Sequence, residues 1–161
     1  MDIDQNLINK LDSAPVEDKQ EILGLLEQLE EAKKLEAARA GYIDFVRTMW
    51  PAFIDGEHHK IMASAFERIA RGELKRLIVN MPPRHTKSEF ASFLLPAWMV
   101  GRNPKLKIIQ STNTTELSVR FGRKAKQLMD SPEYKEVFKT RLREDSQAAG
   151  KWETEQGGEY Y

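Results

Sequence analysis

The chain has 161 residues, the length of one ordinary domain or slightly more. With 40% apolar and 31% charged residues it can form a core, and it lacks the bias of an acidic disordered tail. The absence of cysteine excludes a disulfide framework, a thiolate zinc site and a cysteine nucleophile. No apolar run reaches bilayer length, and the first residues are acidic where a signal or transit peptide would be basic, so we expect a cytosolic protein.

The formal net charge of zero hides an uneven distribution of charge along the chain. Residues 1–40 hold ten acids and five bases, whereas residues 71–126 hold twelve bases and three acids. A basic block of this size suggests a site for phosphates. The alternative is a solvated surface on which Lys and Arg stems lie over apolar neighbours.

The first forty residues predict an acidic, amphipathic helical leader. Ser13 is the expected N-cap, and Pro15 lies in the first turn, where proline is favoured. Apolar residues then recur at helical spacings of three and four up to about Ala40: Ile22, Leu25 or Leu26, Leu29, Ala32 and Leu35. This helix could pack on the following domain, dock a partner or self-associate.

Two shorter helices are expected next. Residues 42–50 predict a helix that ends at Trp50, because a residue before proline avoids the α region. Residues 57–71 predict a second helix with Gly72 as its C-terminal stop. Its apolar face is expected to consist of Ile61, Ala65, Phe66 and Ile69.

From residue 77 the pattern is that of an α/β domain. Residues 77–79 form a short apolar, β-rich run that predicts a buried strand, and residues 106–110 predict a second strand. A helix over 89–100, ended or kinked by Pro96, lies between them, and a capping box at 113–116 opens a basic helix. A short helix from Ser131 and half of a hairpin near Gly157 and Gly158 complete the chain. Strand, helix and strand make a βαβ unit, which predicts a parallel sheet flanked by helices.

The loop after the first predicted strand carries the chemistry. Lys87 and Ser88 stand at the loop–helix junction, where a phosphate-binding loop has a lysine for the terminal phosphates and a hydroxyl for Mg²⁺. The pattern G-x-x-x-x-G-K-[ST] is not matched, because Met81 and Thr86 replace the two glycines. A β-branched residue tolerates positive φ poorly, so Thr86 implies strain or a different loop shape. Arg84 could compensate for the two N–H groups lost at the prolines, and an ordinary basic loop remains the alternative.

The segment 76–89, RLIVNMPPRHTKSE, resembles the variant Walker A strand and loop of the large terminase subunit of tailed bacteriophages. The surrounding sequence is similar to that family in the same order. The similar elements are His58-His59, Arg71-Gly72-Glu73, Pro96-Ala97-Trp98, Gly101-Arg102-Asn103-Pro104, Gln110-Ser111, Phe121-Gly122-Arg123 and Trp152 with Gly157-Gly158-Glu159-Tyr160.

The resemblance implies a DNA-packaging motor that hydrolyses ATP with Mg²⁺. Residues 41–161 would be the N-terminal part of a P-loop ATPase domain, with a parallel sheet incomplete at its C-terminus. Lys87 and Arg84 would be the catalytic residues, and Ser88 would bind Mg²⁺. The nucleotide-binding set it implies is Pro83, Arg84, His85, Thr86, Lys87, Ser88 and Gln110.

The same resemblance implies partners and a place of action. The partners would be double-stranded viral DNA, the portal and the small terminase subunit, and the complete protein would form a homo-oligomeric ring. The protein would act in the cytoplasm of an infected or lysogenic bacterium and would not be part of the mature virion. The acidic Walker B strand and the nuclease carboxylates of the family are absent from this sequence, so we expect very slow hydrolysis by this chain alone.

Two alternatives to the packaging ATPase remain open. The chain could be a non-catalytic interaction module whose acidic N-terminal helix docks the small terminase subunit or the portal. It could also belong to another P-loop motor of helicase type. For His58 and His59 a surface or packing role is favoured over a site role, because adjacent residues on a helix diverge and cannot share one metal.

Overall fold

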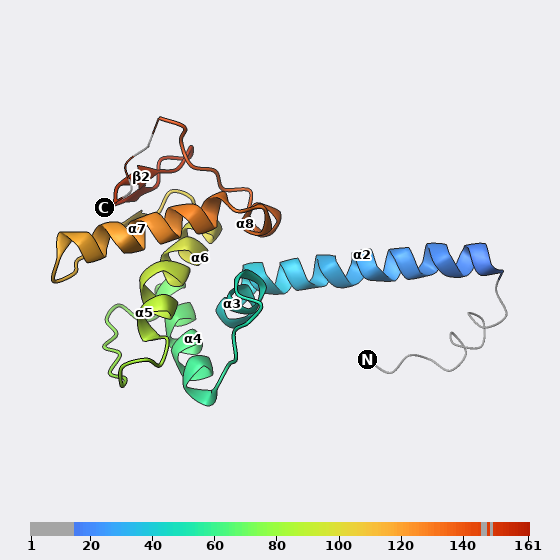
Figure 1. Cartoon of the computed structure of the whole chain (residues 1–161), viewed down its shortest axis with the longest axis horizontal. Coiled ribbons are helices and arrows are strands. Elements are labelled where there is room, and N and C mark those ends of the chain that lie inside the picture. Colours follow the sequence, from blue (N-terminus) through green and yellow to red (C-terminus); the bar gives the residue numbers. More distant parts are fainter. Residues whose placement is uncertain (1–14, 146–147, 149) are drawn as a thin grey trace. The chain divides into compact units, whose positions relative to one another are not determined.

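A computed structural model describes residues 15–145, 148 and 150–161, and most of these residues are helical (Figure 1). The described residues divide into two units, with the boundary between Lys34 and Leu35. The long helix α2, Val16–Ala40, contributes to both, since its last turn from Leu35 belongs to the second unit.

The first unit confirms the predicted N-terminal helix from Val16 onward. The proposed N-cap, Ser13, lies outside the described residues. Four leucines of α2 are about half exposed: Leu23, Leu25, Leu26 and Leu29 have between 45% and 58% of their surface accessible. Of the predicted apolar stripe, Leu25, Leu26, Leu29 and Ala32 are exposed, whereas Ile22 is half-buried and Leu35, in the second unit, packs against its core.

Helices α3 (Tyr42–Met49) and α4 (Glu57–Ala70) confirm the two predicted short helices. Helix α4 ends before Gly72, whose φ of +76° is the left-handed conformation that suits glycine. The predicted buried face of α4 is wrong in part, because Ile61 is 66% exposed while Phe66 is buried. The buried face runs along His59, Met62, Ala63 and Phe66, at helical spacings of three and four.

The core of the second unit is built from aromatic side chains of several helices. The buried Tyr42 ring lies edge-on to Phe66 and Phe90, with ring centroids 5.7 and 4.9 Å away. Trp98 is fully buried beside Tyr42, and its indole N–H donates to the carbonyl of Ala38 in the last turn of α2. This contact provides a partner for one of the carbonyls that a helix end leaves without one.

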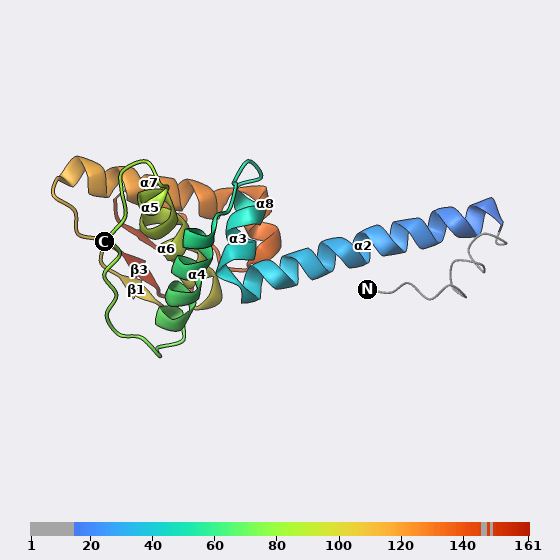
Figure 2. The same cartoon turned by 90° about the horizontal axis from the view of Figure 1, so that it is seen from below.

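The predicted parallel sheet flanked by helices is wrong. The described strands are β1 (Lys107–Ile108), β2 (Trp152–Glu153) and β3 (Glu159–Tyr160), which form a small mixed sheet in the order β1-β3-β2. β1 and β3 are parallel and lie side by side in Figure 2, whereas β2 and β3 are antiparallel. The sheet therefore confirms the second predicted strand in shortened form, and it confirms the C-terminal hairpin.

The first predicted strand, residues 77–79, is absent from this sheet. The segment is irregular backbone, and Ile78 is 86% exposed. A strand forms only where a neighbouring strand forms hydrogen bonds with its N–H and C=O groups, and no described strand lies beside this segment. Three apolar residues indicate an extended chain, but they do not provide the neighbour, so the expected βαβ unit does not form.

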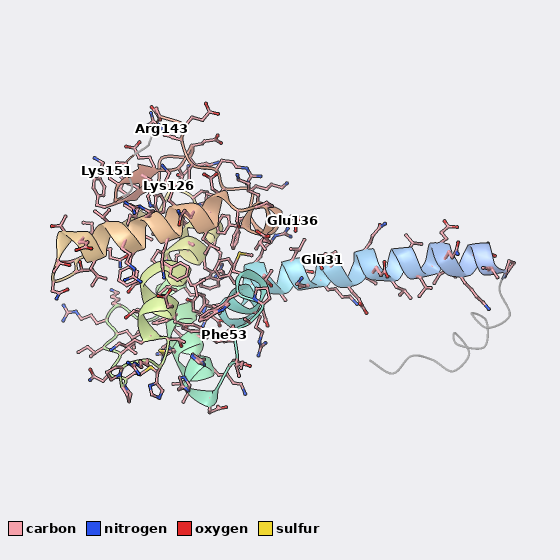
Figure 3. All side chains as sticks on the ribbon, in the orientation of Figure 1. Glu31, Phe53, Lys126, Glu136, Arg143 and Lys151 are labelled. Carbon is pink, nitrogen blue, oxygen red and sulfur yellow. The ribbon has the colours of Figure 1, made fainter. Side chains whose placement is uncertain are left out.

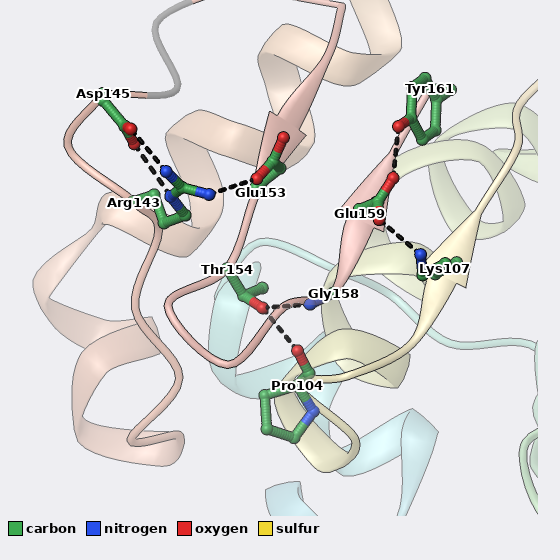
Figure 4. Close-up of polar contacts among 9 residues, drawn as sticks. All are labelled: Pro104, Lys107, Arg143, Asp145, Glu153, Thr154, Gly158, Glu159 and Tyr161. Carbon is green, nitrogen blue, oxygen red and sulfur yellow. Dashed lines mark hydrogen bonds and ion pairs between the residues drawn. The ribbon is translucent and has the colours of Figure 1, made fainter.

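The hairpin that ends the chain is stabilised by polar contacts (Figure 4). Thr154 accepts a hydrogen bond from the N–H of Gly158 at 2.8 Å, and its hydroxyl donates to the carbonyl of Pro104. Gly157 takes a φ of +88° between them, a value that favours glycine. These contacts place β3 against β1, because Gly158 passes close to the chain that enters β1.

The remaining helices follow the loop that ends at Thr86. Residues Lys87–Arg102 run without interruption as α5 (Lys87–Glu89), the π-helical turn η1 (Phe90–Leu94) and α6 (Leu95–Arg102). The π turn ends two residues before Pro96, whose ring and missing N–H disfavour a regular α-helical hydrogen bond there. The helical run continues past Pro96 to Arg102, so Pro96 does not end the helix. Helices α7 (Thr115–Asp130) and α8 (Pro132–Val137) follow, and the cap of α7 is Thr114, one residue later than the predicted Asn113.

Candidate functional site

The loop from Met81 to Glu89 folds around a hollow of about 430 Å³, and all of its lining residues come from this one segment. The two prolines of the loop are exposed and line the hollow, so their rings leave it open. The hollow lies at the start of the helical run that begins at Lys87. The first N–H groups of a helix have no partner within the helix, and the helix dipole makes this end positive. The arrangement can hold an anion.

Thr86, at the position of the second glycine in the plain motif, adopts the left-handed conformation, with φ of +57° and ψ of +3°. Its carbonyl accepts the first helical hydrogen bond, from the N–H of Phe90, so Thr86 is the N-cap of α5. A non-glycine residue in this conformation costs about 1–2 kcal/mol. Of the two outcomes that the sequence allows for Thr86, strain is the one present. Arg84 also has a positive φ, +64°.

A buried histidine from another helix contacts this strained residue. His59, 4% exposed, lies in the first turn of α4, and its Nε2 is 2.6 Å from the Thr86 hydroxyl. Its Nδ1 accepts a hydrogen bond from the N–H of Gly56 at 3.0 Å. A backbone N–H can only donate, so the ring proton of neutral His59 must be on Nε2 and is donated to Thr86. The Thr86 hydroxyl in turn donates to the carbonyl of His85.

The surroundings of His59 favour the neutral form of its ring. Burial is the main cause of a pKa lowered below its ordinary value of 6.5, and the neighbouring His58 contributes in the same direction. The rings of His58 and His59 are 3.8 Å apart, so they do not diverge as the sequence analysis assumed. Phe53, labelled in Figure 3 on the segment between α3 and α4, packs edge-on against the His59 ring at 4.8 Å. The predicted packing role of His59 is thus present together with a polar one.

The two cationic side chains of the loop differ in their partners. Lys87 is half-buried and reaches back along the loop, where its Nζ donates to the carbonyl of Met81 at 3.4 Å. Arg84 is exposed, and within the described residues its guanidinium forms no hydrogen bond or ion pair. Ser88 is exposed in the first turn of the helix, and its hydroxyl likewise has no partner in the described part of the chain. All three side chains belong to residues that line the hollow.

The acid that follows the motif is already paired. Both oxygens of Glu89 accept hydrogen bonds from Lys124 of α7, at 2.9 and 2.7 Å. The Lys124 ammonium also lies over the Phe93 ring, 5.1 Å from its centroid. This ion pair holds the start of the helix against α7 and leaves Glu89 as a structural acid rather than a free ligand.

Of the residues that the sequence implies for this site, the structure brings together six and places one elsewhere. Pro83, Arg84, His85, Thr86, Lys87 and Ser88 all line the loop hollow. Gln110 lines a different hollow of about 530 Å³, between residues 91–99 and 106–112. Its side-chain oxygen accepts a hydrogen bond from the Tyr160 hydroxyl, and its N–H donates to the carbonyl of Tyr161. Gln110 therefore joins β1 to the end of β3.

His59 lies next to the site, whereas the sequence pattern favoured a surface or packing role for it. A signal was present, because His59 precedes Met62, Ala63 and Phe66 at spacings of three, four and seven, the buried face of one helix. A histidine on a buried face needs polar partners, since an unpaired buried polar group is costly. The predicted buried face of α4 was based on its most apolar residues, including Ile61. His59 does not lie on that face, so the prediction left it outside the core.

Comparisons with protein-family models, with curated proteins and with solved structures find no match to this chain. The described part of the chain contains no cluster of three or more His, Asp or Glu side chains that could hold a metal ion. Among the helices of the described residues, none combines the length and the apolar character that a membrane crossing requires.

Proposed function

We propose that the loop from Met81 to Glu89 binds the phosphates of a nucleoside triphosphate, and that the chain is the ATP-binding part of a phage DNA-packaging motor. The observation that carries the proposal is the hollow at the start of the Lys87–Arg102 helical run, lined by Lys87, Arg84 and Ser88. It joins a helix N-terminus to two cations and a hydroxyl, the groups that polyphosphate recognition uses. The resemblance of residues 76–89 to the large terminase subunit supplies the biological context.

Three residues of the loop have distinct roles in this proposal. The Lys87 ammonium would leave the Met81 carbonyl and bind the terminal phosphates, because a charged acceptor forms the stronger hydrogen bond. The exposed Arg84 guanidinium would offer its planar fork to phosphate oxygens. The left-handed Thr86 starts the helix, whose first N–H groups would be the backbone donors.

The residues present fit Mg²⁺ carried by the nucleotide. Mg²⁺ in proteins binds to one or two side chains, keeps several waters and takes the remaining ligands from phosphates. Ser88, exposed in the first helical turn, offers one hydroxyl for this purpose, while Glu89 is engaged by Lys124. Bound Mg²⁺ would neutralise charge on the β- and γ-phosphates. Binding of MgATP is therefore the activity that this loop supports most directly.

The wider proposal includes the partners that the resemblance implies. They are double-stranded viral DNA, the portal and the small terminase subunit, with a homo-oligomeric ring as the complete motor. The place of action would be the cytoplasm of an infected or lysogenic bacterium. Hydrolysis of ATP belongs to that whole motor.

The test is titration calorimetry of MgATP with the wild-type chain and with Lys87→Ala. Loss of one charged hydrogen-bonding group is expected to weaken binding by about tenfold to hundredfold. Lys105→Ala is the matched control, because Lys105 is an exposed lysine remote in sequence from the loop, and it should bind as the wild type does. Equal binding by wild type and Lys87→Ala, or binding by neither, would refute the proposal.

A second candidate function rests on helix α2. Its leucines at 23, 25, 26 and 29 are about half exposed, and the segment before Ala40 is acidic. An exposed apolar stripe of this kind fits a module that docks another protein. If the chain fails to bind MgATP but binds a small terminase subunit or a portal protein, and Leu25→Lys together with Leu29→Lys removes that binding, this candidate is favoured.

A further inference from the structure

The left-handed Thr86 raises a physical question about the loop. Glycine takes this conformation at little cost, whereas threonine carries a branched Cβ that disfavours it. Strained backbone persists where the surrounding structure holds it. Whatever holds Thr86 therefore determines the shape of the loop and the direction from which the chain enters the helix at Lys87.

The contact that can hold Thr86 comes from outside the loop. The Thr86 hydroxyl lies 2.6 Å from His59 Nε2, and the His59 ring is itself held by the N–H of Gly56 at Nδ1. The ring is packed between Phe53 and Phe90, with centroids at 4.8 and 5.3 Å, so it has little freedom to follow a moving loop. His59 is thus a fixed donor on α4, 27 residues earlier in the chain than the residue it contacts.

The three hydrogen bonds that link Gly56, His59, Thr86 and His85 have compatible donor and acceptor directions. Gly56 N–H donates to His59, His59 donates to the Thr86 hydroxyl, and that hydroxyl donates to the carbonyl of His85. The Thr86 side chain is therefore bonded on both sides, and its Cβ position is determined relative to α4. The two bonds together require a hydroxyl group at position 86, because one bond is accepted and the other is donated.

We propose that His59 is a positioning residue for the phosphate loop: its hydrogen bond to Thr86 holds a non-glycine residue in the left-handed conformation that directs Lys87 and Ser88 into the hollow. The inference rests on the proposed function, since the loop shape matters through phosphate binding. His59 acts through Thr86 and does not itself touch the ligand. Glycine in the plain motif can adopt the left-handed conformation without support, whereas here Thr86 adopts it with the support of His59.

The experiment is a double-mutant cycle between His59→Phe and Thr86→Gly, read with MgATP and with inorganic tripolyphosphate. In the wild-type background, His59→Phe keeps the ring packing, removes the donor and should weaken binding of both probes by about tenfold, equivalent to about 1.4 kcal/mol. In the Thr86→Gly background, glycine needs no support, so adding His59→Phe should change affinity by less than about twofold. An equal loss in both backgrounds would mean that His59 only packs, and would overturn the proposal.

A second variant and a structural readout keep the test decisive if His59→Phe does not fold. Thr86→Val removes the hydroxyl from the other side of the same hydrogen bond and should reproduce the loss. His58→Phe is the matched control, since within the described residues the neighbouring His58 forms no hydrogen bond to Thr86, and it should leave affinity unchanged. The ¹³Cα and ¹³Cβ chemical shifts of Thr86 report its φ and should leave left-handed values in His59→Phe.

The outcomes separate this inference from the proposed function. If wild-type chain binds neither probe but His59→Phe still shifts Thr86 out of the left-handed region, phosphate binding is refuted and the positioning by His59 stands. If the Thr86 shifts are unchanged in His59→Phe, the positioning role is overturned whether or not MgATP binds.

Discussion

The indole of Trp98 provides the most quantitative test of how the second unit is held together. Trp98 is fully buried, and its Nε1–H donates to the carbonyl of Ala38 at 3.1 Å. Ala38 lies in the last turn of α2, where carbonyls have no partner within the helix, and it is also fully buried. Replacing Trp98 by Phe keeps an aromatic ring and leaves this carbonyl without a donor.

The cost of Trp98→Phe has two parts. An unsatisfied buried carbonyl costs about 1–3 kcal/mol, and the smaller ring leaves a void beside Tyr42 that adds about 1 kcal/mol. We therefore expect the free energy of unfolding to fall by about 2–4 kcal/mol. Such a loss is a large fraction of the stability of an ordinary domain.

The assay is urea unfolding followed by far-ultraviolet circular dichroism, because tryptophan fluorescence changes with the substitution itself. Trp50→Phe is the matched control. Trp50 is half-buried against Phe53, and its indole has no hydrogen bond within the described residues, so its replacement should cost less than about 1 kcal/mol. The reasoning is refuted if the two variants lose the same stability.

Three further predictions concern pH and close packing. Because the pKa of His59 in the folded chain lies below 6.5, the unfolded chain takes up its proton first, so stability should fall as pH drops below about 6.5, and His59→Phe should reduce this slope in urea midpoints. Burial raises the pKa of Tyr160 to about 12 and that of Tyr42 well above 10, so stability should decline as pH rises past 10, while the ultraviolet absorbance of tyrosinate increases; a flat urea midpoint up to pH 12 would contradict this. Gly158→Ala would place its Cβ 2.4 Å from the Pro104 carbonyl oxygen and should cost about 1–3 kcal/mol, whereas Gly24→Ala meets no atom within 4 Å and should raise helix content; equal melting shifts would argue against the close approach at the hairpin.

Local features of the chain were predictable because their causes are local. The helix from Val16, the stop at Gly72, the short helix from Pro132 and the C-terminal hairpin each follow from residues within one or two turns of the feature. The loop followed the same logic, since the conflict between threonine and positive φ can be recognised from the motif alone.

What the sequence could not decide depended on partners distant in the chain. Residues 77–79 have the composition of a strand, yet a strand exists only where a neighbour pairs with it, and none of the described strands does. Likewise, the buried side of α4 depends on what packs against it, and for that reason Ile61 faces solvent and His59 faces the core.

The sequence by itself therefore determined the helices, the turns and the chemical groups of the loop, because propensity, capping and glycine conformation act over a few residues. Only the tertiary structure decided that the sheet is small and mixed, that Gln110 lies in another hollow, and that His59 contacts Thr86. These outcomes depend on contacts between segments that are far apart in the chain. No local pattern of residues in a single sequence specifies which of these segments pack together.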